Sequence, residues 1–178
     1  MKPLFAAVCV TASLPAQIPQ AFEETRMHLE TSFDVVVHAS YAETAALFGP
    51  EGECAWAGKH WDPQFIHPSP ARDIEGAVFT VKHGPLSAVW VIATHDTDGR
   101  HFKYVYFIAD LMVTTIDVRF TPIDTATTQV YVTYARTAMT PEGDEHVVAM
   151  NSADKNSGKE WQSGINSYFA NRKPAANR

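Results

Sequence analysis

Aromatic side chains at alternate positions of the middle segments are the residues best suited to chemistry in this chain. Tyrosine and tryptophan each combine a broad apolar surface with one polar atom, so they can hold an apolar ligand and orient its hydroxyl or carbonyl group. The residues that we expect to line such a site are Trp90, Tyr104, Tyr106, Ile116 and Tyr134. The alternative is that they pack a solid core against a helix, as aromatic residues do in many proteins without a ligand.

No set of residues at fixed spacing demands catalysis. A cyclase or dehydratase would need a positioned acid or base in the site, for which Tyr104, Tyr106 and His60 are the candidates. The sequence has no Ser-His-Asp or Cys-His signature, no glycine-rich phosphate loop and no nucleophile elbow. Cys54 has no assignable base and is interpreted as a small loop residue. The sequence therefore predicts no catalytic residue.

A cation, Arg136, follows the aromatic segment. If its strand turns Val130, Val132 and Tyr134 inward, Arg136 also lies inside, which is costly unless a carboxylate of the protein or of a ligand pairs with it. The alternatives are that the strand presents its other face, or that the long stem of Arg136 reaches water at the strand end. We favour the first face as the inner one.

Eight histidines raise the question of a metal site. His95 and His101 become neighbours if the hairpin between them has a three-residue loop. Zinc needs three or four ligands, and only Asp96 at the turn is near enough to be a third. A solvated pair is the better interpretation, and the sequence predicts neither a metal nor a cofactor.

The first element expected is a strand from His28 to His38, where apolar and polar residues alternate. Ser40 with Glu43 forms a capping box that begins a short helix, and Gly49-Pro50 is expected to end it. A loop or broken helices then follow over 51–73.

That loop contains Trp56, His60, Trp61 and Pro63, and its prolines stiffen it. We expect it to cover one end of the ligand site. Trp61 is a ligand-binding candidate, whereas Trp56 is interpreted as structural. For Trp61, the alternative to ligand contact is the same structural role, in which the loop anchors itself by burying both indoles.

Four long strands are expected between Val78 and Thr140. A three-residue loop, Thr97-Asp98-Gly99 with Gly99 left-handed, pairs residues whose numbers sum to 196 and sets Trp90, Ile92 and Thr94 beside Tyr106, Tyr104 and Phe102. A two-residue turn would shift this register by one. The next strand places the alternate residues from Met112 to Phe120 on the same inner face.

The C-terminal region is expected to be helical after Thr140-Pro141-Glu142-Gly143, with an interruption near Asn156-Ser157-Gly158. Beyond it, Trp161, Ile165, Tyr168 and Phe169 recur at spacings of three and four, which predicts a stripe that packs against the sheet.

This order of elements resembles the SRPBCC superfamily, the START-like or birch-pollen-allergen-like helix-grip proteins, over about 28–172. The more specific pieces are 56–63 (WAGKHWDP), 89–92 (VWVI) followed by His95-Asp96, and 137–143 (TAMTPEG). The resemblance implies an α+β helix-grip fold, in which a curved antiparallel β-sheet wraps around a long C-terminal helix and leaves a cavity. Members bind lipids, sterols, polyketides or hormones, and some are cyclases, aromatases or co-chaperones. The break near Gly158 departs from the usual uninterrupted helix.

The chain of 178 residues, 46% of them hydrophobic, is long enough for one domain with a core. We expect an N-terminal extension over 1–26, a START-like ligand-binding domain over 27–172 and a disordered tail over 173–178. Residues 1–26 partly fit a secretory signal. If they are one, the protein is periplasmic or secreted; if they are not, it is cytoplasmic. The net charge of −6 and the lack of a basic cluster argue against nucleic acid and anionic membranes as partners.

The function expected is non-catalytic binding of an apolar or aromatic small molecule, lipid-like or polyketide-like, in an internal cavity. The alternatives are a polyketide cyclase or aromatase and a co-chaperone-like interaction module. We expect no stable membrane insertion, and the sequence leaves the oligomeric state open. The ligand-binding candidates are Trp61, Trp90, Ile92, Tyr104, Tyr106, Ile116, Tyr134, Arg136, Trp161 and Ile165.

Overall fold

The computed structural model describes residues 25–172. The expected leader over 1–26, except its last two residues, and the tail over 173–178 lie outside the described residues. The elements in chain order are β1 (His28–Val37), α1 (Tyr41–Ala45), α2 (Pro50–Glu53), β2 (Gln64–His67), β3 (Val78–His83), β4 (Leu86–Asp96), β5 (His101–Ile108), β6 (Met112–Asp124), β7 (Thr127–Ala138), α3 (Pro141–Ala153), a 3-10 turn (Asp154–Asn156) and α4 (Ser157–Asn171).

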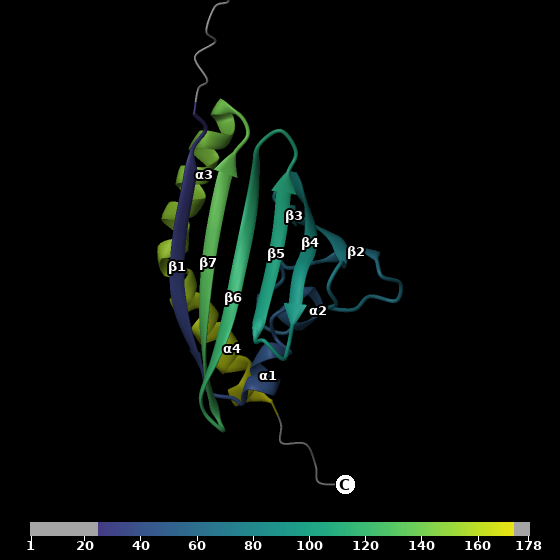
Figure 1. The fold of residues 1–178 in the computed structure, drawn as a ribbon, viewed down its shortest axis with the longest axis vertical. Helices are drawn as coiled ribbons and strands as arrows, with labels where there is room; N and C mark the ends of the chain where they lie inside the picture. Colours follow the sequence, from purple (N-terminus) through teal and green to yellow (C-terminus); the bar gives the residue numbers. More distant parts are fainter. Residues whose placement is uncertain (1–24, 173–178) are drawn as a thin grey trace, which may run out of the picture.

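The seven strands form one antiparallel sheet in the order β1-β7-β6-β5-β4-β3-β2, and α3 and α4 pack along it against β1 and β7 (Figure 1). The predicted α+β helix-grip architecture is confirmed. The strand count differs, because β3 is a separate strand and the short β2 forms from the loop after the tryptophans. Within the described residues, none of the helices has the length and apolar character that crossing a bilayer requires.

The central hairpin has the predicted register in its middle. Trp90 pairs with Tyr106 and Ile92 with Tyr104, but a bulge after Ile92 shifts the pairing nearer the turn, so that His95 rather than Thr94 lies opposite Phe102. The expected neighbours His95 and His101 are therefore not opposite each other.

The turn of this hairpin also differs from the expectation. The residue with positive φ is Arg100, at 57°, not Gly99. Gly99 is instead held close to Asp96, whose carboxylate accepts a hydrogen bond from its backbone nitrogen at 2.7 Å. A Cβ at position 99 would lie 2.1 Å from Asp96 Oδ2, so a close approach explains the glycine there.

The inner faces of β6 and β7 follow the predicted alternation. Met112, Thr114, Ile116, Val118 and Phe120 are all buried on β6. The favoured face of β7 is also the inner one, since Val130, Val132 and Arg136 are buried and Tyr134 is partly buried. Arg136 thus lies inside the protein, and the two alternatives for its strand are wrong.

The proline at position 50 begins a helix instead of only ending one. Ser40 caps α1 as predicted, accepting a hydrogen bond from the backbone nitrogen of Glu43, but α1 ends at Ala45. Gly49 and Pro50 occupy the N-cap and first position of α2. Proline fits there because its missing N–H has no partner in the first turn of a helix.

The C-terminal helix is interrupted as predicted. Thr140 caps α3 and accepts a hydrogen bond from the backbone nitrogen of Gly143 at 3.1 Å. A 3-10 turn over Asp154–Asn156 separates α3 from α4. At the start of α4 Gly158 lies close to β1, where a Cβ would meet the carbonyl oxygen of Asp34 at 3.1 Å. Trp161 and Ile165 then face the sheet.

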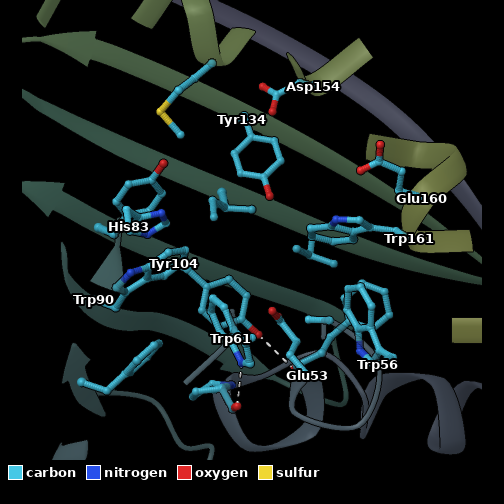
Figure 2. Close-up of a pocket in the computed structure, with 18 of the residues that line it drawn as sticks. Glu53, Trp56, Trp61, His83, Trp90, Tyr104, Tyr134, Asp154, Glu160 and Trp161 are labelled. Carbon is cyan, nitrogen blue, oxygen red and sulfur yellow. Dashed lines mark hydrogen bonds between the residues drawn. The ribbon is translucent and has the colours of Figure 1, made fainter. Parts of the chain in front are cut away.

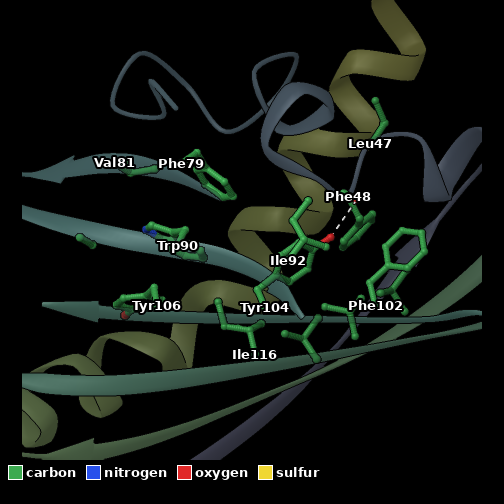
Figure 3. Close-up of a cluster of buried hydrophobic side chains, with 14 of the residues drawn as sticks. Leu47, Phe48, Phe79, Val81, Trp90, Ile92, Phe102, Tyr104, Tyr106 and Ile116 are labelled. Atoms are coloured by element: carbon green, nitrogen blue, oxygen red, sulfur yellow. Dashed lines mark hydrogen bonds between the residues drawn. The ribbon is translucent and has the colours of Figure 1, made fainter. Parts of the chain in front are cut away.

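The core lies between the inner face of the sheet and the segments that cover it (Figure 3). Phe48, from the segment between α1 and α2, lies beside Ile92 of β4 and Tyr104 of β5 there. The rings of Phe48 and Phe120 are 5.2 Å apart in an edge-to-face contact. This contact fixes the segment that carries α2 over the sheet.

Candidate ligand cavity

A cavity of about 350 Å³ lies between the inner face of the sheet, the segment from α2 to β2, and the helices α3 and α4 (Figure 2). The strands supply most of its wall, while α2 and the tryptophan loop close one side, where the ring of Trp56 lies 5.2 Å from that of Trp161 on α4. The lining residues are Phe48, Pro50, Glu53, Trp56, Ala57, Trp61, Phe79, His83, Trp90, Tyr104, Tyr106, Ile116, Val118, Tyr134, Arg136, Met150, Asp154, Glu160 and Trp161.

Most of the residues singled out from the sequence line this cavity. They are Trp61, Trp90, Tyr104, Tyr106, Ile116, Tyr134, Arg136 and Trp161. Ile92 and Ile165 do not line it, and each is fully buried among core side chains. The alternation of apolar residues along a strand or helix identifies side chains that face inward. It does not tell which of these border the cavity and which are packed beneath other side chains. The loop residue His60 is exposed and also lies outside the lining.

An aromatic ladder runs across four strands, and three of its rings, those of Phe79, Trp90 and Tyr106, form one wall of the cavity. Phe65, Phe79, Trp90 and Tyr106 are successive cross-strand partners on β2, β3, β4 and β5. Their rings stack, with centroids 5.5 Å, 5.7 Å and 4.2 Å apart along the row. Cross-strand stacking holds the rings in place, so this wall is a preformed apolar surface.

The tryptophan loop is anchored by its indole nitrogens. Trp56 Nε1 donates to the carbonyl oxygen of Leu47 at 2.8 Å, and Trp61 Nε1 donates to the carbonyl oxygen of Pro50 at 2.9 Å. Both rings still line the cavity. Trp56 and Trp61 therefore do both things that were considered for them: the indole nitrogen anchors the loop, and the ring lines the cavity.

Glu53 is a functional candidate that the sequence reasoning missed. It is on α2, and its carboxyl group lies in the cavity between Trp56 and Trp61 (Figure 2). Burial, and secondarily the charge of Asp73, raise the pKa of Glu53 to about 8, although the backbone at Gly49 opposes the shift. The only signal in the sequence was an acidic residue next to the tryptophan loop, three residues after Pro50.

The cavity tyrosines differ in what their hydroxyl groups do. Tyr104 donates to the carbonyl oxygen of Phe48 at 3.0 Å, so its hydroxyl is engaged in holding the segment before α2. The hydroxyl of Tyr134 points into the cavity (Figure 2). Burial raises the pKa of both well above the usual value, so both are neutral donors at physiological pH.

Arg136 has a partner within the protein. Its guanidinium contacts both carboxylate oxygens of Asp154, with Nη2 and Oδ1 3.2 Å apart, and it lies over the ring of Tyr134 at 4.5 Å. Burial lowers the pKa of Arg136, but the hydrogen bonds and charge of Asp154 outweigh burial, and the net pKa is raised. A ligand carboxylate is therefore not needed to neutralise this cation.

The histidines do not form a metal centre within the described residues, where no three His, Cys, Asp or Glu side chains come together. His101 contacts Asp117, with Nε2 and Oδ2 2.7 Å apart. His83 lines the cavity beside Trp90, and burial followed by the proximity of His146 lowers its pKa. His83 is thus an uncharged wall residue at neutral pH.

Comparison with known proteins identifies the fold. No protein-family model matches the sequence, and no curated protein matches it. Norcoclaurine synthase from Thalictrum flavum, in a structure with dopamine and hydroxybenzaldehyde, has a TM-score of 0.63 at 10% identity and covers 96% of this chain and 99% of its own.

Two further structures agree with that similarity. Ara h 8.0201 has a TM-score of 0.56 at 11% identity, covering 82% of this chain and 100% of its own. CalU16 from Micromonospora echinospora has a TM-score of 0.54 at 13% identity, covering 85% of this chain and 83% of its own. In its fold, this chain is similar to these proteins, which agrees with the helix-grip fold that the sequence resemblance predicted.

Proposed function

We propose that the protein binds a small aromatic or apolar molecule in the cavity between its sheet and its C-terminal helices. The observation that carries this proposal is that all four tryptophans of the chain, at positions 56, 61, 90 and 161, line the same cavity. Indole rings used only for packing would fill the space between them. Here they surround about 350 Å³ of it.

The size of the cavity limits the ligand. Small-molecule pockets usually measure about 300–1,000 Å³, so this one is at the lower end. A molecule with one or two fused rings fits better than a long acyl chain or a sterol. The stacked wall of Phe79, Trp90 and Tyr106 favours a flat ring, because aromatic rings gain most from offset stacking or edge contacts.

An acid-base enzyme is the second candidate, and Glu53 favours it. A carboxyl group with a pKa of about 8 in an apolar cavity can give or take a proton near neutral pH. Two of the three groups that the sequence offered for this role are less suitable, because Tyr104 is hydrogen-bonded to the backbone and His60 is exposed, while Tyr106 lines the cavity. An interaction module of the co-chaperone kind would need no open cavity, which makes it the weakest of the three.

Isothermal titration calorimetry with naphthalene-2-methanol and with palmitate tests the binding proposal. We expect the two-ring alcohol to bind, and palmitate to bind at least tenfold more weakly because its chain exceeds the cavity. Ile116→Trp should abolish binding by filling the cavity, whereas Thr115→Trp, on the outer face of the same strand, should leave it unchanged. Equal loss in both variants, or no binding by the unmodified protein, would contradict the proposal.

A further inference from the structure

Acidic groups outnumber basic groups on the lining of the cavity. Three carboxyl groups line it, from Glu53, Asp154 and Glu160, and the only cation on the lining among the described residues is Arg136. Arg136 is already held by both oxygens of Asp154. His83 is uncharged at neutral pH, because burial lowers its pKa. No free positive charge of the described lining is left to pair with an anionic ligand.

Tryptophan rings surround the carboxyl group of Glu53. It lies between Trp56 and Trp61, with Trp161 beyond it on α4 (Figure 2). Electron-rich indole rings attract cations, and they do so more strongly where water is excluded. A carboxyl group among indole rings therefore provides both a counter-ion and a favourable environment for an organic cation.

We infer that the ligand of this cavity carries a protonated amine beside its aromatic ring, with Glu53 as the counter-ion and Trp56, Trp61 and Trp161 around the charge. This inference rests on the proposed ligand-binding function and narrows it to aromatic amines. Glu160 has an exposed side chain at the cavity rim, where water screens it, so it does not replace Glu53 in this role.

The electrostatics of Glu53 make the inference measurable. Its titratable neighbours are Asp73, Cys54, Tyr104 and Tyr134. The pKa of Glu53 is about 8, so at pH 7 it must release its proton before it pairs with a cation. The affinity for an amine should therefore rise with pH, by up to about tenfold per unit, and level off above about pH 8.

Calorimetry between pH 6 and pH 8.5 with two matched probes, naphthalene-2-methylamine and naphthalene-2-methanol, tests the inference. The amine stays protonated in this range, and the alcohol is neutral with nearly the same shape. At pH 8 we expect the amine to bind at least tenfold more tightly, and we expect only the amine to show the pH slope. Naphthalene-2-carboxylate should bind more weakly than either.

The variants assign the effect to one carboxyl group. Glu53→Gln should equalise the two affinities and remove the slope, while Glu51→Gln, on the exposed side of the same helix and outside the cavity lining, should keep both. An amine that binds no better than the alcohol at pH 8 overturns the inference and leaves the binding function standing. Loss of the preference in Glu160→Gln instead of Glu53→Gln overturns it too. Failure of every probe to bind overturns both proposals.

The comparison on the unmodified protein does not depend on the folding of any variant. If Glu53→Gln fails to fold, the ratio of the two affinities and its change with pH still decide the question. A flat ratio from pH 6 to pH 8.5 counts against Glu53 as the counter-ion.

Discussion

Breaking the buried pair of Arg136 and Asp154 should cost far more stability than breaking an exposed pair. Arg136 is 2% exposed and Asp154 is 9% exposed, and Asp154 supplies two contacts to the guanidinium. Asp154→Asn removes the negative charge but nearly keeps the shape. It leaves a cation inside the protein with only neutral neighbours.

The expected magnitude follows from the geometry. Removing one partner of a buried pair costs about 3–5 kcal/mol, because the other charge stays desolvated. Asp154 borders the cavity, where water can reach it, so we expect the lower end, about 3 kcal/mol. Replacing both, as in Arg136→Met with Asp154→Leu, removes the desolvation cost together with the attraction, and it should return stability to within about 1 kcal/mol of the unmodified protein.

Urea denaturation followed by far-ultraviolet circular dichroism measures these changes, and it avoids the tryptophan signal, which comes entirely from the cavity wall. Arg172→Gln is the control, since Arg172 and Glu43 form a pair in which each side chain is about half exposed. That control should cost under about 1 kcal/mol. The reasoning is refuted if Asp154→Asn costs no more than Arg172→Gln, or if the double variant is as unstable as Asp154→Asn.

Three further outcomes are expected. The pKa of Glu53 is raised from 4.5 to about 8, so its contribution to stability is full below about pH 4.5 and is lost as pH rises through 8. Glu53→Gln should therefore gain stability relative to the unmodified protein from pH 5 to pH 8. Urea titrations at several pH values check this, and a constant difference between the two proteins would contradict it. Ile165→Ala should cost about 2–5 kcal/mol by urea unfolding because Ile165 is fully buried, whereas Val148→Ala, at a 44% exposed position, should cost under about 0.5 kcal/mol. Gly143→Ala should cost about 1–3 kcal/mol, since its Cβ would lie 2.1 Å from the carbonyl oxygen of Leu111; an unchanged melting temperature would show that the backbone yields freely.

For the ionisable groups of the cavity, the sequence predicted which way a side chain faces but not which groups surround it. The inward position of Arg136 followed from the alternation along its own strand, because successive side chains of a strand point to opposite faces. Its partner, Asp154, is on a turn between two helices, and no local pattern links the two positions. Glu53 was missed for a similar reason, since its raised pKa comes from burial beneath segments distant in the sequence.

The central hairpin shows the same division on a smaller scale. Side-chain alternation and a short polar turn were enough to pair Trp90 with Tyr106. The bulge after Ile92 and the left-handed Arg100 were not predictable, because both depend on how the strand end fits its neighbours.

By itself, the order of residues along the chain determined which side chains face inward, where the C-terminal helix breaks, and hence the helix-grip architecture. These features follow from periods of two and of three to four residues and from local capping, which act between near neighbours. Only the tertiary structure decided that eight of the ten candidates surround open space, that Ile92 and Ile165 are covered, and that the carboxyl group of Glu53 lies among the tryptophans. Enclosed volume, desolvation and charge pairing depend on segments far apart in the sequence, so they exist only once the chain is folded.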